Sequence, residues 1–236
     1  MHIAILMTNT DESAFSQAHP KDGEKFKALL APLRPDWRFS VFEVKDGVFP
    51  PGVDGFDGFI ITGSPASVHD KAPWVERLFG LIREIVDRGV PLFGACFGHQ
   101  AIAMALGGDV GANPEGWVLG IVETDYTEPA PWMAGDSAQI RLYAAHLEQV
   151  TALPEGARVL GGTRACPIGS FAIREHVFTT QYHPEMTHGF MAALTKQLDG
   201  KLTPKATATA QESLAEKAET DRVATWIIAF FEYSRE

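Results

Sequence analysis

The sequence predicts an α/β protein with a doubly wound, mainly parallel sheet, helices on both faces and a small, partly antiparallel extension. Short apolar runs alternate with amphipathic stretches, which is typical of a parallel sheet covered on both faces. From residue 118 to residue 173 the pattern changes to short strands and turns, which indicates the antiparallel extension. A chain of 236 residues can bury one large core, so we expect a single domain over residues 1–236.

The first half of the chain alternates strands and helices. Ile3–Met7 is an apolar run and is expected to be the first buried strand. Trp74–Arg88 is the clearest helix, because its apolar residues recur at helical spacing and Gly89 follows as a C-cap. Further strands are expected at Arg38–Val44, Gly58–Thr62 and Val90–Phe93, and further helices at Lys21–Ala31 and Ala101–Leu106.

The second half contains the extension, one more buried strand and a helical tail. Within residues 118–173, short strands are expected at 120–123, 139–142 and 158–160. Val177–Tyr182 is predicted to be the last strand, and the chain is expected to be helical from about residue 187. The polar tract Lys201–Glu219 is either a solvated connection or an exposed helix, and the apolar run Val223–Phe231 follows it.

Composition and charge exclude several classes of protein. Thirty Asp and Glu outnumber 20 Lys and Arg, and the net charge of −10 argues against a nucleic-acid partner or an anionic membrane surface. No apolar run approaches the roughly 18 residues of a membrane span, and the N-terminus lacks the basic region and cleavage site of a signal peptide. Two cysteines do not make a disulfide scaffold. We therefore expect a cytoplasmic enzyme or binding protein.

The segment Gly94-Ala95-Cys96-Phe97-Gly98 has the pattern of a nucleophile elbow, in which a strand turns sharply into a helix. The residues two positions before and after the nucleophile must be small, and both are glycine. The turn would expose Cys96 beside a helix N-terminus, whose partial positive charge favours a thiolate. A buried cysteine that happens to lie between two glycines is the alternative interpretation.

A cysteine nucleophile needs a base, and the chain offers eight histidines. His183 differs from the others because it follows an apolar strand, whose end projects into the same crevice as the elbow. Pro184 stiffens the chain there, and Glu185 can accept a proton from the imidazole and so fix its tautomer. Taken alone, His183-Pro184-Glu185 favours the other interpretation, a histidine at a strand end beside a solvated glutamate.

Together the two motifs resemble the class I glutamine amidotransferase family, which uses a Cys-His-Glu triad. The resemblance spans about the first 190 residues and is strongest at 94–100 and at 181–185. It continues at Thr62-Gly63-Ser64-Pro65, at 153–154 and at 166–168. Residues 146–150 look like a segment of the amidotransferase part of GMP synthetase, and residues 96–100 with Gly116-Trp117 are similar to gamma-glutamyl peptidases.

The resemblance implies a role for each matching residue. Cys96 would attack the γ-carbonyl carbon of glutamine or of another γ-glutamyl compound, His183 would be the general base and acid, and Glu185 would orient His183. The backbone N–H groups of Gly63 and Phe97 would form the oxyanion hole, where one donor is typically worth about 3 kcal/mol.

The same resemblance implies how the substrate is held. Gln100 would contact the glutamyl group, and His146, Leu147 and Glu148 would line the end that recognises its amino-acid head. No organic cofactor is expected. No metal is expected either, because neither paired cysteines nor a His-Glu-x-x-His spacing occurs.

Three hypotheses about function remain open. The first is a glutaminase, a cysteine-nucleophile amidohydrolase that passes ammonia to a separate synthetase. The second is a self-sufficient gamma-glutamyl peptidase or hydrolase; no nucleotide-binding loop of the Gly-x-x-x-x-Gly-Lys type occurs in the chain. The third is a non-catalytic binding module with the same fold.

Overall fold

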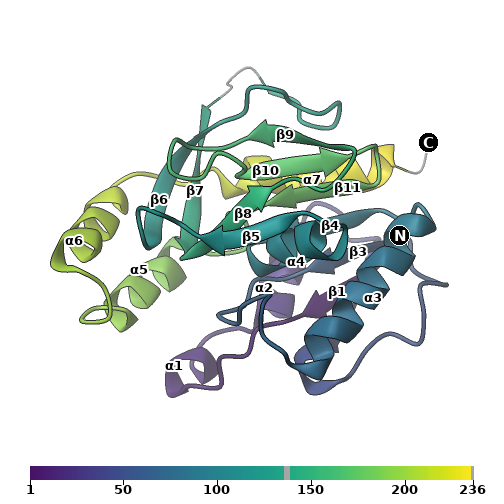
Figure 1. The fold of residues 1–236 in the computed structure, drawn as a ribbon, viewed down its shortest axis with the longest axis horizontal. Coiled ribbons are helices and arrows are strands. Elements are labelled where there is room, and N and C mark those ends of the chain that lie inside the picture. The colour runs from purple at the N-terminus through teal and green to yellow at the C-terminus, as the bar shows by residue number, and fades with distance from the viewer. Residues whose placement is uncertain (136–138, 235–236) are drawn as a thin grey trace.

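The computed structural model of the protein describes residues 1–135 and 139–234. The described residues form a seven-stranded sheet and two separate two-stranded ribbons, with helices packed around them (Figure 1). The strand order of the large sheet is β2-β1-β3-β4-β11-β10-β9, and the first five of these strands are parallel. The bounds are His2–Met7 (β1), Arg38–Glu43 (β2), Gly58–Ile61 (β3), Leu92–Ala95 (β4), Ala157–Gly161 (β9), Ser170–Ile173 (β10) and Val177–Thr180 (β11).

Both faces of the sheet are covered because its inner strands are apolar on both sides. In β1, Ile3 and Ile5 belong to one hydrophobic cluster, while Ala4 and Leu6 belong to the other. The first cluster is completed by α2 (Asp22–Leu30) and α7 (Thr220–Tyr233), and the second by α3 (Pro73–Asp87) and α4 (Phe97–Ala105). The predicted doubly wound α/β class, with helices on both faces, is confirmed.

The antiparallel part is divided between the sheet and the ribbons. Strands β9 and β10 extend the large sheet, as predicted, and pair antiparallel. The ribbons are separate from it: β5 (Asp109–Ala112) pairs with β8 (Glu148–Ala152), and β6 (Val118–Asp125) pairs with β7 (Gln139–His146). The β6–β7 ribbon has a hydrophobic cluster of its own, in which Leu119 and Tyr143 pack against the C-terminal helices α5 (His188–Gln197) and α6 (Pro204–Ser213).

The polar tract 201–219 contains a helix with one buried side. Thr203 caps α6, since its hydroxyl accepts the N–H of Ala206 at 3.2 Å. Ala210 of this helix is fully buried beside Gly120 of β6. Of the two alternatives that the sequence left open, the structure shows a helix, but it covers only Pro204–Ser213 and is not fully exposed.

Three short elements have no counterpart in the sequence prediction: the strand β5, the helix α1 (Ala14–Gln17) and the 3₁₀ turn η1 (Val44–Asp46). None of the three is longer than four residues, so hydrophobic patterning cannot reveal them. No helix among the described residues is long and apolar enough to span a membrane.

We propose that the helices and strands described above form a single domain, since helices from both ends of the chain pack on the same sheet.

The topology places several loops at one edge of the sheet. The order β2-β1-β3 means that the chain leaves β1 in one direction and returns to the other side of it as β3. In open α/β sheets ligands bind at such a switch point, beyond the carboxyl ends of the strands. Thr8, Gly63, Cys96 and His183 all lie beyond the carboxyl ends of these parallel strands.

Candidate active site

Cys96 lies at the junction of β4 and α4 in an uncommon backbone conformation. Its φ is 51° and its ψ is −106°, a combination that non-glycine residues seldom adopt. Hydrogen bonds hold both sides of the junction: Cys96 N–H donates to the Thr180 carbonyl at 2.8 Å, and its own carbonyl accepts Gln100 N–H at 3.1 Å. Helix α4 thus starts directly after Cys96, as the elbow pattern predicts, and includes most of the predicted helical stretch Ala101–Leu106.

The two flanking glycines explain why the sharp turn is possible. A Cβ on Gly94 would lie 2.7 Å from the carbonyl carbon of Gly98. A Cβ on Gly98 would overlap the Ile61 carbonyl oxygen of β3. Only residues without a side chain allow strand and helix to approach this closely.

His183 is held by β7 through its backbone and by Glu185 through its imidazole ring. Its backbone N–H donates to the Tyr143 carbonyl at 2.8 Å, and its Nδ1 lies 2.8 Å from Glu185 Oε1. Both side chains are buried, with 5% and 1% of their surfaces exposed. The second nitrogen, Nε2, has no hydrogen-bond partner among the described residues. The Glu185 contact fixes the proton on Nδ1 in the neutral ring and leaves Nε2 available.

The charges around His183 favour its protonated form. Burial by itself lowers the pKa of an imidazole, but the Glu185 carboxylate and a Cys96 thiolate oppose this effect. The opposing charges dominate and hold the pKa of His183 well above its ordinary value of 6.5. A proton transferred from Cys96 to this ring would therefore be retained there.

Gly63 lies between the side chains of Cys96 and His183. A Cβ on Gly63 would lie 2.8 Å from Cε1 of His183 and 3.5 Å from Cβ of Cys96. The two side chains therefore flank the same glycine, and all three residues line one cavity. The structure thus brings together the cysteine and the histidine that the sequence separates by almost ninety positions.

Two buried threonines hold the turn that contains Gly63. The hydroxyl of Thr8, which is fully buried, lies 3.0 Å from the Thr62 carbonyl oxygen and 3.1 Å from the Gly63 carbonyl oxygen. The Thr62 hydroxyl accepts the N–H of Thr8 at 3.1 Å. The Thr62 carbonyl and the Gly63 N–H belong to the same planar peptide group and point in opposite directions. The hydrogen bond from Thr8 to the Thr62 carbonyl therefore also fixes the direction of the Gly63 N–H.

Phe97 contributes to the site through its backbone. It is the first residue of α4, where an N–H has no acceptor within the helix. Its side chain is 1% exposed and packs on Trp74, with the ring centroids 5.5 Å apart. The position is thus compatible with the predicted N–H donor, whereas the ring is part of the core.

The four residues assigned to substrate binding lie next to the cavity wall rather than on it: Ala145 lines the cavity, and the charge of His183 acts on the neighbouring His146. Gln100 Nε2 donates to the Glu148 carbonyl at 2.7 Å, and His146 Nδ1 lies 3.1 Å from the same oxygen. Burial, the main cause, lowers the pKa of His146 to about 4, so the ring is neutral. Leu147 is 40% exposed, and the Glu148 carboxylate accepts the Ser67 hydroxyl at 3.1 Å. None of the four lines the cavity of Cys96 and His183.

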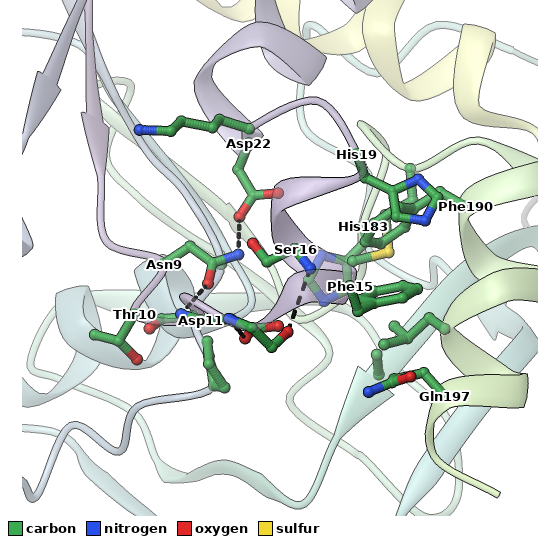
Figure 2. Close-up of a pocket in the computed structure, with 18 of the residues that line it drawn as sticks. Asn9, Thr10, Asp11, Phe15, Ser16, His19, Asp22, His183, Phe190 and Gln197 are labelled. Carbon is green, nitrogen blue, oxygen red and sulfur yellow. Dashed lines mark hydrogen bonds between the residues drawn. The ribbon is translucent and has the colours of Figure 1, made fainter.

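Residues that the sequence prediction missed form most of that cavity, which has a volume of about 690 Å³. The segment from Asn9 to Pro20 after β1 supplies one wall, and α5 with its flanks supplies another. Figure 2 shows Phe15, His19 and Phe190 grouped near His183 in this view. The position of this segment after a parallel strand was a signal for a binding loop, because such loops meet at the ligand-binding edge.

The described residues contain no group of three His, Cys, Asp or Glu side chains arranged to hold a metal ion.

The other cysteine, Cys166, is a free thiol that is 1% exposed. Burial, with a smaller effect of Cys96, raises its pKa to about 12. Cys166 is therefore protonated and unreactive at neutral pH.

A family model described as glutamine amidotransferase class-I matches residues 38–197. Gamma-glutamyl peptidase 3 of Arabidopsis thaliana is 29% identical over 195 residues, which cover 79% of this chain and 78% of that protein. A glutamine-hydrolysing GMP synthase of Clostridium novyi is 34% identical over 131 residues, which cover 55% of this chain and 24% of that protein.

Solved structures with low sequence identity share the fold. A glutamine amidotransferase of Thermotoga maritima superposes with a TM-score of 0.78 at 16% identity, over 100% of this chain and 98% of that one. A glutamine amido transferase of Methylobacillus flagellatus gives a TM-score of 0.77 at 21% identity, over 98% and 94% of the two chains.

Proposed function

The chain belongs to the class-I glutamine amidotransferase family, and on that premise we propose that it hydrolyses γ-glutamyl amides with Cys96 as the nucleophile. The observation that carries the proposal is the arrangement around Gly63. A cysteine at a strained strand–helix junction and a histidine held by a buried glutamate flank one glycine, at the edge of a cavity. This is the arrangement that acyl transfer through a thioester requires.

The reaction proceeds in two steps. His183 first takes the thiol proton of Cys96 and retains it, Cys96 Sγ attacks the γ-carbonyl carbon, and the proton held on His183 passes to the departing nitrogen as the C–N bond breaks. Water then attacks the γ-glutamyl thioester, His183 takes a proton from it, and the thiol forms again as glutamate leaves. The N–H groups of Gly63 and Phe97 stabilise the oxyanion in both steps.

The size of the cavity favours a self-sufficient hydrolase of γ-glutamyl conjugates. Free glutamine releases only ammonia, which needs almost no space beyond the scissile bond. A volume of about 690 Å³ at Cys96 and His183 lies in the range of pockets that hold drug-sized ligands. The similarity to gamma-glutamyl peptidase 3, which covers most of both chains, supports the same choice.

A second candidate is the glutaminase that supplies ammonia to a separate synthetase. The similarity to the GMP synthase of Clostridium novyi supports it. The experiment that separates the two measures purified protein on glutamine and on γ-glutamyl dipeptides side by side. The proposed hydrolase turns over a dipeptide faster than glutamine with no partner present. Hydrolysis of glutamine alone, accelerated by an added synthetase, would favour the second candidate.

Removing the hydroxyl of Thr8 is expected to reduce kcat about 10- to 100-fold with little change in KM. Thr8→Val removes the hydrogen bond to the Thr62 carbonyl, so the Gly63 N–H is no longer directed at the oxyanion. One such donor is worth about 3 kcal/mol of transition-state stabilisation. Thr8→Ser keeps the hydroxyl and should restore most of the rate. Steady-state kinetics with a γ-glutamyl dipeptide measure both.

A reaction of Cys96 that forms no oxyanion distinguishes a positioning role of Thr8 from a general loss of structure in Thr8→Val. Alkylation of Cys96 by iodoacetamide passes through no tetrahedral intermediate, so Thr8→Val should leave its rate almost unchanged. If alkylation and hydrolysis slowed by the same factor, the positioning role of Thr8 would be wrong.

Neutralising Glu185 is expected to move the alkaline limb of the pH–rate profile to lower pH. The carboxylate helps to raise the pKa of His183, and protonated His183 is the acid that the leaving nitrogen needs. In Glu185→Gln that pKa falls, so the acid is lost at a lower pH, and kcat at neutral pH falls about 10-fold or more. Glu155→Gln, an exposed site, is the matched control. An alkaline limb that stayed in place in Glu185→Gln would contradict the assignment.

A further inference from the structure

The residues that line the large cavity beside the reacting pair are not the ones assigned to the glutamyl group. His183 and Cys96 line it, whereas Gln100, His146, Leu147 and Glu148, assigned to the glutamyl group, do not. In the proposed reaction the departing nitrogen must lie at His183, since this residue protonates it. The part of the substrate attached to that nitrogen would then extend into the cavity.

Aromatic rings of two elements form one wall of this cavity. Phe15 and His19 come from α1 and the residues after it, and Phe190 comes from α5 (Figure 2). The ring centroid of Phe190 lies 5.7 Å from that of Phe15 and 5.2 Å from that of His19. The rings therefore make a continuous aromatic surface, and Met186 and Leu194 add apolar area beside it.

A buried ion pair holds this wall in place. Lys25 Nζ lies 3.5 Å from the centroid of the Phe190 ring and 2.7 Å from Asp22 Oδ1. Asp22 Oδ2 accepts the Nδ2 of Asn9 at 2.6 Å, and Asn9 Oδ1 accepts the N–H of Asp11 at 2.8 Å. The network connects the segment after β1 to α2 and α5, so the aromatic surface is organised before a ligand arrives.

The charges of the lining are largely compensated within the protein. The Lys25 and Asp22 side chains are only 8% and 5% exposed and satisfy one another. Lys45 lies 2.6 Å from Glu12, and Lys21 lies 2.7 Å from Glu43. Apart from the reacting pair Cys96 and His183, the remaining charged lining residues are of opposite sign: Asp11 and Lys201. A lining of this kind offers an apolar surface to a ligand and no strong field of either sign.

We propose that the surface formed by Phe15, His19 and Phe190 binds the amine component of the substrate, and that this component carries an apolar, preferably aromatic, side chain. The inference rests on the proposed γ-glutamyl hydrolysis and specifies its substrate class. The substrate is then a γ-glutamyl amide of an amino acid or amine with such a side chain.

Two dipeptides of equal charge test the inference. γ-Glutamylphenylalanine and γ-glutamylglycine carry the same carboxylates and differ only in the side chain of the amine component. Burial of a phenyl group predicts that kcat/KM is about 10- to 100-fold higher for the phenylalanine dipeptide. Equal kcat/KM values, with Cys96-dependent hydrolysis of both, would overturn this inference and leave the proposed function intact. If neither dipeptide were hydrolysed, both would fail.

Variants locate the preference on the aromatic wall. Phe190→Ala and Phe15→Ala should each reduce the ratio of the two kcat/KM values to within about 3-fold of one. The ratio is insensitive to a uniform loss of active protein, because both dipeptides are measured on the same preparation. Leu33→Ala, which truncates an exposed apolar side chain (43% exposed) after α2, should keep the wild-type ratio. A ratio unchanged in both Phe variants would contradict the proposal.

Discussion

Replacing Cys96 by alanine is expected to lower the rate of γ-glutamyl hydrolysis by at least about a thousand-fold. The alanine side chain has no nucleophile, so neither step of the thioester route can proceed. The backbone at Cys96 is held by the Thr180 and Gln100 hydrogen bonds, which do not involve the thiol. The midpoint of urea unfolding should therefore stay close to that of the wild type.

Cys166→Ala is the matched control for this variant. It also removes a buried thiol, but one whose raised pKa keeps it protonated. We expect it to keep most of the activity and to lose roughly 1 kcal/mol of stability. If Cys96→Ala retained activity, the nucleophile would be wrongly assigned, and the hypothesis of a non-catalytic module with the same fold would gain support.

Gly98→Ala is expected to be strongly destabilising, by about 2–4 kcal/mol, and to remove most of the activity. The new Cβ would overlap the carbonyl oxygen of Ile61 and lie 2.9 Å from the Ile61 carbonyl carbon. Both contacts are with the backbone of β3, so no side-chain rotation relieves them. Helix α4 must shift away from the sheet, and Cys96 at its start must shift with it.

Gly80→Ala is the matched control for the second variant. Gly80 lies exposed within α3, and a Cβ there would meet nothing within 4 Å. The same substitution should stabilise this helix by about 0.5–1 kcal/mol, because alanine has the higher helix propensity. Urea unfolding followed by far-UV circular dichroism compares the two variants. Equal midpoints for Gly98→Ala and Gly80→Ala would refute the packing constraint at the elbow.

The sequence predicts the parallel sheet and the elbow well because their signals are local. The apolar run Ile3–Met7 and the helical period of residues 74–88 each reveal an element and its burial. The glycines around Cys96 reveal a close approach of strand and helix that the structure shows between Gly98 and Ile61.

The wall of the cavity could not be predicted in the same way. Phe15 and Phe190 lie 175 positions apart in the chain, and their contact depends on how α5 packs beside the segment after β1. Helix α1 has only four residues, too few for a periodic pattern. From the sequence alone, Lys25 and Asp22 are expected to be exposed surface charges. Only the fold brings them together as a buried ion pair.

The most direct test is to look for the covalent intermediate on Cys96. The protein is mixed with a γ-glutamyl dipeptide, quenched in acid within the first turnovers, digested and examined by mass spectrometry. The proposed chemistry predicts one γ-glutamyl group on the peptide that contains Cys96, absent from the peptide with Cys166 and released when the quenched protein is treated with hydroxylamine. Continued turnover with no acyl group on Cys96 at any quench time, or an acyl group at another residue, would contradict it.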